Sequence, residues 1–180
     1  MKAIIYTSNT GSTAEYAQLL GKELNLPVHS LQKAKNKVPA GSEIIYLGWI
    51  MAGGIKGYKK AAKLYKVCVV CGVGMGQTGT QLKELRDKNT IPQRIPLFTL
   101  QGNFDVKKLR GTYRFMMNVM VKTAGKGLAN KPDRTPEEDD MLDMMVNGGK
   151  RVSLQNLKAV TEWYKSCLLY TSPSPRDRQK

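Results

Sequence analysis

Histidine, cysteine and long apolar runs are scarce in this 180-residue sequence, and each shortage excludes a class of protein. His29 is the only histidine, and without a convergent group of cysteines it supplies neither a zinc site nor a Ser/His/Asp triad. No apolar stretch approaches the roughly 20 residues of a membrane-spanning helix. Only three apolar residues follow Met1 and Lys2, which is too few for the apolar core of a secretory signal. We therefore expect a cytoplasmic protein without a metal site.

Acidic residues are also few: the chain has 14 Asp and Glu residues and 29 Lys and Arg residues. The formal net charge of +15 favours anionic partners such as acidic proteins, carboxylate ligands or an anionic membrane surface. The lysines are spread thinly, with no recognition-module signature and no stacked aromatic residues between them. We therefore do not expect nucleic-acid binding.

The three cysteines suit a reducing compartment, and two of them form the motif CVVC from Cys68 to Cys71. Such spacing occurs in redox dithiols. The surrounding residues are typical of a buried strand, in which side chains three apart point to opposite faces. We therefore interpret the pair as two small buried apolar residues rather than as a redox site.

Short apolar runs alternate with helical patterns over the first hundred residues. The runs are nearly continuous in apolar residues, which implies helices on both faces of a doubly wound, five-stranded parallel sheet. A polar loop is expected at Lys33–Ser42 and a Gly-rich turn after Trp49. The expected strands are Lys2–Thr7, Pro27–Leu31, Glu43–Trp49, Lys66–Val73 and Ile95–Leu100, and the expected helices follow Thr13, Ile55 and Thr80.

A helical insert is expected at about 103–152, where the alternation stops. Its first helix runs from Val106 to about Thr123, and its second begins at a capping box, Thr135–Glu138. A final helix follows Ser153, with Leu154, Leu157, Val160 and Tyr164 on one face. We expect one domain, 1–166, followed by a disordered tail, 167–180. That Ser/Pro-rich tail resembles a translated sequencing adapter, so it is a candidate non-native segment.

The segment YTSNTGST, Tyr6–Thr13, holds six hydroxyl-bearing side chains and no charge. It joins the first strand to the first helix, where unpaired N–H groups and the helix dipole favour an anion. Ser8, Asn9, Thr10, Gly11, Ser12 and Thr13 are the predicted phosphate ligands. The loop lacks the lysine of a Walker A motif. The alternative is that its Ser and Thr residues merely cap the helix.

The stretch IIYTSNTGSTAEYAQLL resembles the signature of the flavodoxin family, and the resemblance extends over about Met1 to Ser166. It implies a flavodoxin-like sheet with strand order 2-1-3-4-5 and one non-covalently bound flavin mononucleotide (FMN). The flavin ring would lie between the loops that follow the third and fourth strands. Trp49 would stack on the ring beside Ile50, Met51 and Ala52, and Gly74, Met75 and Gly76 would flank its other side.

The second of these loops departs from the usual pattern, because many flavodoxins have an aromatic residue where this chain has Gly-Met-Gly. The same segment, Gly74–Gly79, also fits the dinucleotide fingerprint GxGxxG. It follows the fourth strand rather than the first, and no acidic residue ends the next strand to hold a ribose. We therefore favour FMN over a dinucleotide.

The insert and the basic charge resemble those of menaquinone-dependent protoporphyrinogen oxidases. The expected function is electron transfer to a redox partner protein or a quinone. The alternatives are a quinone-linked flavin dehydrogenase and a flavodoxin-fold module that has lost its cofactor. Nothing in the sequence identifies a residue that would act as a general acid or base.

The first insert helix, Val106–Thr123, is predicted to be amphipathic. Leu109, Tyr113, Met116 and Met120 share one face, and Lys107, Lys108, Arg110, Arg114 and Lys122 lie opposite, with Phe115 on the basic side. Gly111 would weaken the helix from within. Either the apolar side packs on the sheet, or the helix contacts an anionic membrane or an acidic partner.

Overall fold

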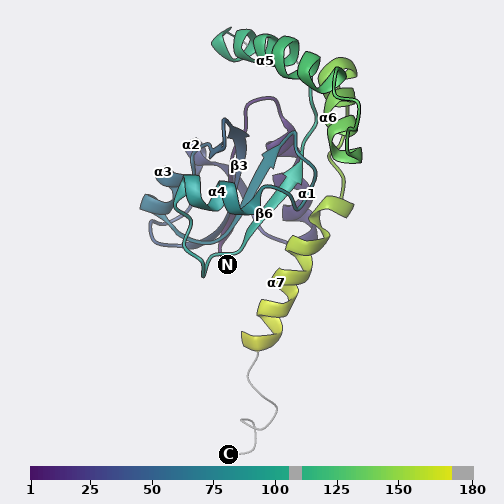
Figure 1. The fold of residues 1–180 in the computed structure, drawn as a ribbon. Coiled ribbons are helices and arrows are strands. Elements are labelled where there is room, and N and C mark those ends of the chain that lie inside the picture. Colours follow the sequence, from purple (N-terminus) through teal and green to yellow (C-terminus); the bar gives the residue numbers. More distant parts are fainter. Residues whose placement is uncertain (106–110, 172–180) are drawn as a thin grey trace, which may run out of the picture.

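The computed structural model describes residues 1–105 and 111–171, and a parallel sheet lies at its centre (Figure 1). The strand order is β2-β1-β3-β5-β6, so the predicted doubly wound sheet with order 2-1-3-4-5 is confirmed. A two-residue strand, β4, pairs antiparallel with β3. The strands are β1 (Ala3–Thr7), β2 (Val28–Ser30), β3 (Glu43–Met51), β4 (Gly54–Ile55), β5 (Lys66–Gly74) and β6 (Leu97–Gln101).

Helices cover both faces of the sheet because successive strand residues alternate between two apolar cores. Ile5 and Tyr46 point to the face covered by α2 (Leu31–Ala34), α3 (Tyr58–Leu64) and α4 (Leu82–Asn89). Ile4 and Leu47 point to the face covered by α1 (Ser12–Leu24), the 3₁₀ turn η2 (Gln155–Leu157) and α7 (Lys158–Thr171). Each core is closed by the apolar stripe of its helices.

The structure differs from the sequence-based expectation at two places between β2 and α3. Lys33–Ser42 is not wholly a loop, because α2 occupies its start: the Ser30 hydroxyl accepts a hydrogen bond from the Lys33 amide, and Leu31 and Ala34 are buried. Strand β3 also continues past Trp49 to Met51 and turns into β4 through Ala52 and Gly53, both with positive φ. A hairpin therefore replaces the expected Gly-rich turn.

The two cysteines of CVVC are free thiols. Cys71 is buried, and this burial raises the pKa of its thiol to about 12. Cys68 is half-buried and sits opposite the register shift between Ile44 and Ile45 of β3. Because a raised pKa disfavours the reactive thiolate, Cys71 behaves as a core residue.

The insert leaves the sheet after β6 and returns to it at Gly149. Phe104 and Gly149 exchange two backbone hydrogen bonds of 2.9 and 3.0 Å, which close its base. Its helices are α5 (Gly111–Ala129) and α6 (Pro136–Asn147), and the capping box between Thr135 and Glu138 is present as predicted. Gly111, with φ +58°, is the first residue of α5 that the structure describes, so it lies at an end of the described helix and not in its interior.

The C-terminal segment also departs from expectation. Leu154, which was predicted to share a helix face with Leu157, Val160 and Tyr164, is 53% exposed because residues 155–157 form a 3₁₀ turn. The other three are buried together in the core on the α1 side of the sheet. Helix α7 runs to Thr171, into the tail predicted to be disordered, and the rest of that tail lies outside the described residues. None of the described helices is long and apolar enough to cross a bilayer.

Candidate functional site

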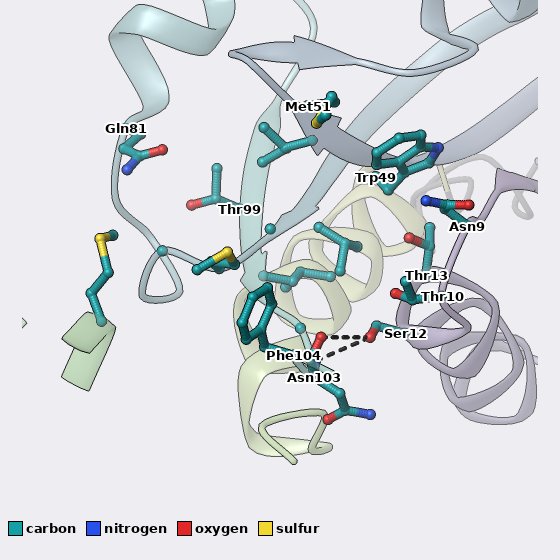
Figure 2. Close-up of a pocket in the computed structure, with 18 of the residues that line it drawn as sticks. Asn9, Thr10, Ser12, Thr13, Trp49, Met51, Gln81, Thr99, Asn103 and Phe104 are labelled. Carbon is teal, nitrogen blue, oxygen red and sulfur yellow. Dashed lines mark hydrogen bonds between the residues drawn. The ribbon is translucent and has the colours of Figure 1, made fainter. Parts of the chain in front are cut away.

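A cavity of about 270 Å³ opens at the carboxyl ends of β1, β3, β5 and β6 (Figure 2). All of the predicted site residues except Ser8 and Gly11 line it, so the structure brings the three predicted loops together around one space. In open α/β sheets this edge is where ligands bind. The predicted residues in its wall are Asn9, Thr10, Ser12, Thr13, Trp49, Ile50, Met51, Ala52, Gly74, Met75 and Gly76.

The first loop presents the N-terminus of α1 to this cavity. Gly11 is the N-cap residue, with φ 109°, and no side chain makes a capping hydrogen bond. The structure therefore argues against the alternative that the Ser and Thr residues serve as caps. The Thr10 and Thr13 hydroxyls have no hydrogen-bond partner among the described residues, and both residues line the cavity. An uncapped helix start with neutral donors beside it is suited to bind an anion.

Ser8, Gly11 and Ser12 have different positions. The Ser8 hydroxyl accepts a hydrogen bond of 3.3 Å from the Gly11 amide and lies outside the cavity. Ser12 lines the cavity, but its hydroxyl exchanges hydrogen bonds with the Asn103 backbone (Figure 2). Gly11 lines a smaller adjoining hollow together with Thr10 and the acidic residues Glu15 and Asp105. Glu15 lines only that hollow, and because its negative charge repels an anion, a phosphate fits better on the Thr13 side, within the main cavity.

The wall that carries Trp49 is the β3–β4 hairpin. A Cβ at Gly48 would lie 2.6 Å from the Lys56 carbonyl oxygen, so glycine allows the chain to fold back closely over β3. The half-buried Trp49 side chain lines the cavity, and the Lys56 ammonium lies 6.0 Å from the centroid of its ring. This cation–π contact restricts the indole without removing it from the cavity.

Buried Asn89 of α4 holds the hairpin in place. Its side-chain oxygen accepts a 2.8 Å hydrogen bond from the Ile55 amide, and its side-chain nitrogen donates to the carbonyl oxygens of Gly53 and Leu85. The turn that includes Ala52 is therefore fixed by a residue from another element.

The loop after β5 is folded onto β6 rather than arranged as a dinucleotide turn. The Gly79 amide donates to the Thr99 hydroxyl at 3.0 Å, and the Thr99 hydroxyl donates to the Thr80 carbonyl oxygen. Helix α4 begins only at Leu82, after Gln81 in the left-handed conformation. The amide of the last glycine of GxGxxG is thus already bonded, and that glycine does not lie at the start of the helix.

Comparison with protein-family models shows which family the chain belongs to. The model described as a flavodoxin domain matches residues 3–129, which is more than half of the sequence. The chain belongs to the flavodoxin family. No curated protein and no solved structure matches it significantly. Members of the flavodoxin family typically bind FMN and act in electron transfer.

Several residues of this flavodoxin cavity were not predicted from the sequence. Thr99, Gly102, Asn103, Phe104 and Asp105 line it from the end of β6. The rule that ligands lie at carboxyl strand ends could have indicated this segment, because Leu97–Gln101 was expected as the last strand. Met120, Met141 and Met145 line the cavity from α5 and α6, and no local sequence signal places them there.

Asn103 connects the phosphate loop to the base of the insert. Its backbone bonds Ser12, its side-chain oxygen accepts from the Arg151 and Val152 amides at 2.7 and 3.0 Å, and its side-chain nitrogen donates to Glu15. Both ends of the insert therefore meet at the first turn of α1. In this flavodoxin the insert is part of the site's framework.

A second link ties the insert to the Met75 loop. The Gln101 side-chain nitrogen donates to the Met75 carbonyl oxygen at 3.4 Å and to the Asp140 carboxylate at 2.5 Å. Asp140 also accepts a 3.1 Å hydrogen bond from Arg151. Because Gln101 touches both the loop and α6, a shift of α6 would move the Met75 side of the cavity.

Proposed function

We propose that this flavodoxin domain binds one FMN non-covalently in the cavity and acts in electron transfer. The observation that carries the proposal is the uncapped N-terminus of α1, with Thr10 and Thr13, in the same cavity as Trp49. A terminal phosphate and a flat aromatic ring are the two groups that such a cavity suits.

The residues present fit this cofactor. Asn9, Thr10 and Thr13 offer neutral amide and hydroxyl donors to the phosphate, together with the free amides at the start of α1. Trp49 offers an aromatic face to the ring, and Met75 offers a polarizable side chain from the loop after β5. The β3–β4 hairpin and Phe104 would shield the bound ring from water.

Bound FMN supplies the one- and two-electron chemistry, and the protein supplies binding, orientation and electrostatics. Trp49 is restricted by Lys56, and the Met75 loop is held by Gln101, so both walls would orient the ring. No described residue is assigned as a general acid or base.

The second candidate function is a quinone-linked flavin dehydrogenase of the protoporphyrinogen oxidase type. One observation favours it: α5 and α6 contribute Met120, Met141 and Met145 to the cavity wall. These adaptable apolar side chains suit a flat apolar molecule beside the cofactor. Substrate-dependent reduction of a quinone by the FMN-loaded protein would support this candidate, and its absence would leave electron transfer between proteins.

The cofactor proposal is tested by absorption and by binding measurements. We expect the purified protein, after incubation with FMN and desalting, to remain yellow and to release FMN, not the adenine dinucleotide. Replacing Thr10 and Thr13 with Ala removes hydrogen bonds to a charged phosphate, at about 1.5–3 kcal/mol each, so FMN binding weakens at least tenfold per residue.

Thr112→Ala, at an exposed position of α5 outside the cavity wall, is the control and should bind FMN as wild type does. A wild-type protein that stays colourless after reconstitution would favour the third alternative, a module without cofactor.

A further inference from the structure

Helix α5 exposes an apolar surface to solvent. Phe115 is 71% exposed, Met116 48% and Val119 45%, although each is a large apolar side chain. The three are spaced along one side of the helix, because residues three or four apart lie on the same face. An exposed contiguous apolar patch of this kind marks an interaction surface more often than chance exposure does.

Positive charge surrounds this patch. Lys122 and Lys126 follow Phe115 and Val119 on the same face at helical spacing, and Arg114 precedes Phe115. All three cations are exposed, and the sequence of α5, GTYRFMMNVMVKTAGKGLA, contains no acidic residue. The surface made by Arg114, Phe115, Met116, Val119, Lys122 and Lys126 is here termed the α5 face.

The α5 face is not the side by which the helix is held. Figure 1 shows α5 standing away from the sheet, with α6 as its neighbour. Gly125 is the buried position among the described residues of α5, and a Cβ added to it would lie 4.0 Å from the Met145 sulfur of α6. The expectation that the apolar side packs on the sheet is therefore wrong for Met116 and Val119.

Charge decides between the occupants that could cover the α5 face. A second copy of the chain would bring another net charge of +15 against the same cations, which opposes association. An anionic lipid surface attracts all three cations at once and accepts the apolar side chains between them. Lysine and arginine stems can lie along the apolar region while their charged ends reach the headgroups.

We propose that the α5 face docks the protein on an anionic membrane surface, with Phe115, Met116 and Val119 inserted at the level of the headgroups. Met120, the next residue along the helix, lines the cavity. Docking would therefore place the cavity beside the lipid. The predicted contacts Lys107, Lys108 and Arg110 lie outside the described residues, and the proposal does not depend on them.

Co-sedimentation with vesicles tests the proposal without flavin. The full chain is mixed with vesicles of phosphatidylcholine alone or of phosphatidylcholine with phosphatidylglycerol. We expect wild-type protein to pellet with the anionic vesicles and to remain in solution with the neutral ones. The variant Arg114→Gln, Lys122→Gln, Lys126→Gln should lose about fivefold in partitioning per cation, and so on the order of a hundredfold in total.

A matched control separates the α5 face from net charge alone. Lys59→Gln, Lys60→Gln and Lys63→Gln remove the same charge from exposed positions of α3, where Tyr58 and Ala61 are buried. This variant should bind nearly as wild type does. A third variant, Phe115→Ser with Val119→Ser, should retain all the cations and still bind more weakly.

Two results would overturn the proposal. One is wild-type protein that fails to pellet with anionic vesicles, which would leave an acidic protein as the partner. The other is an equal loss for the α3 and α5 charge variants, which would show a diffuse charge effect. Circular dichroism of each variant checks that a loss does not come from unfolding.

Discussion

At the scale of single residues, Asn89 is the polar side chain on which the geometry of the cavity most depends. It is buried and satisfies the Ile55 amide and the Gly53 carbonyl oxygen of the β3–β4 hairpin. Asn89→Ala leaves both groups without a partner, at about 1–3 kcal/mol each. We expect urea denaturation to show a loss of about 2–4 kcal/mol in the free energy of unfolding.

The control for this prediction is Asn147→Ala, because Asn147 is exposed and its side-chain nitrogen donates a hydrogen bond to the Asp143 carboxylate. This substitution should lower the free energy of unfolding by much less than Asn89→Ala does, since exposed groups regain water as a hydrogen-bond partner. Equal losses at the two positions would contradict the role assigned to Asn89.

Tyr46 makes the stability of the fold vary with pH in the alkaline range. Burial raises the pKa of its hydroxyl to about 12, with a smaller opposing effect of the hydrogen bond with Thr7. Above pH 10 the unfolded tyrosine releases its proton while the folded one keeps it. Stability that is fully present below pH 10 is therefore lost between pH 10 and 12, by about 2.7 kcal/mol.

Urea denaturation at several pH values measures this loss, and Tyr46→Phe should remove this part of the slope while lowering stability at neutral pH. Buried Cys71, whose thiol pKa is also raised to about 12, contributes a slope from pH 9 upward in both proteins. An unchanged slope in the phenylalanine variant would assign the whole effect to other groups.

At the scale of elements, the C-cap of α4 holds a strained residue. Thr90 is exposed and left-handed, with φ 54°, where a β-branched side chain is unfavourable. Thr90→Gly should therefore raise the free energy of unfolding by about 0.5–1 kcal/mol. This is the net gain once the entropy that glycine adds to the unfolded chain, which lowers stability, has been subtracted. Asn25→Gly, at the left-handed C-cap of α1, should gain less because asparagine tolerates this conformation.

Local patterns explain how much of the fold and the site could be predicted. The apolar strands, the loop between β1 and α1 and the capping box of α6 are each encoded within a few neighbouring residues, and each was predicted. The β3–β4 hairpin has no such signal, because its turn depends on Ala52 adopting positive φ under restraint from Asn89. Met120 and Met145 reach the cavity only through the packing of α5 and α6, which sequence periodicity does not specify.

At the scale of the whole molecule, the net charge of +15 should act on the proposed cofactor. A positive long-range field favours whichever redox state of bound FMN carries more negative charge, and so raises the midpoint potential for the last electron. Distant lysines act through solvent, where the screening length falls from about 10 Å at 0.1 M salt to about 3 Å at 1 M.

We expect the potential of the FMN-loaded protein to fall as salt is added. The charge variant of α3 lacks three lysines outside the cavity wall. Its potential should therefore be lower at low salt and should fall less as salt is added. Redox titration of both proteins at several salt concentrations measures this. A potential that is insensitive to salt, and equal in both proteins, would mean that groups beside the ring, such as Asp105, set it instead.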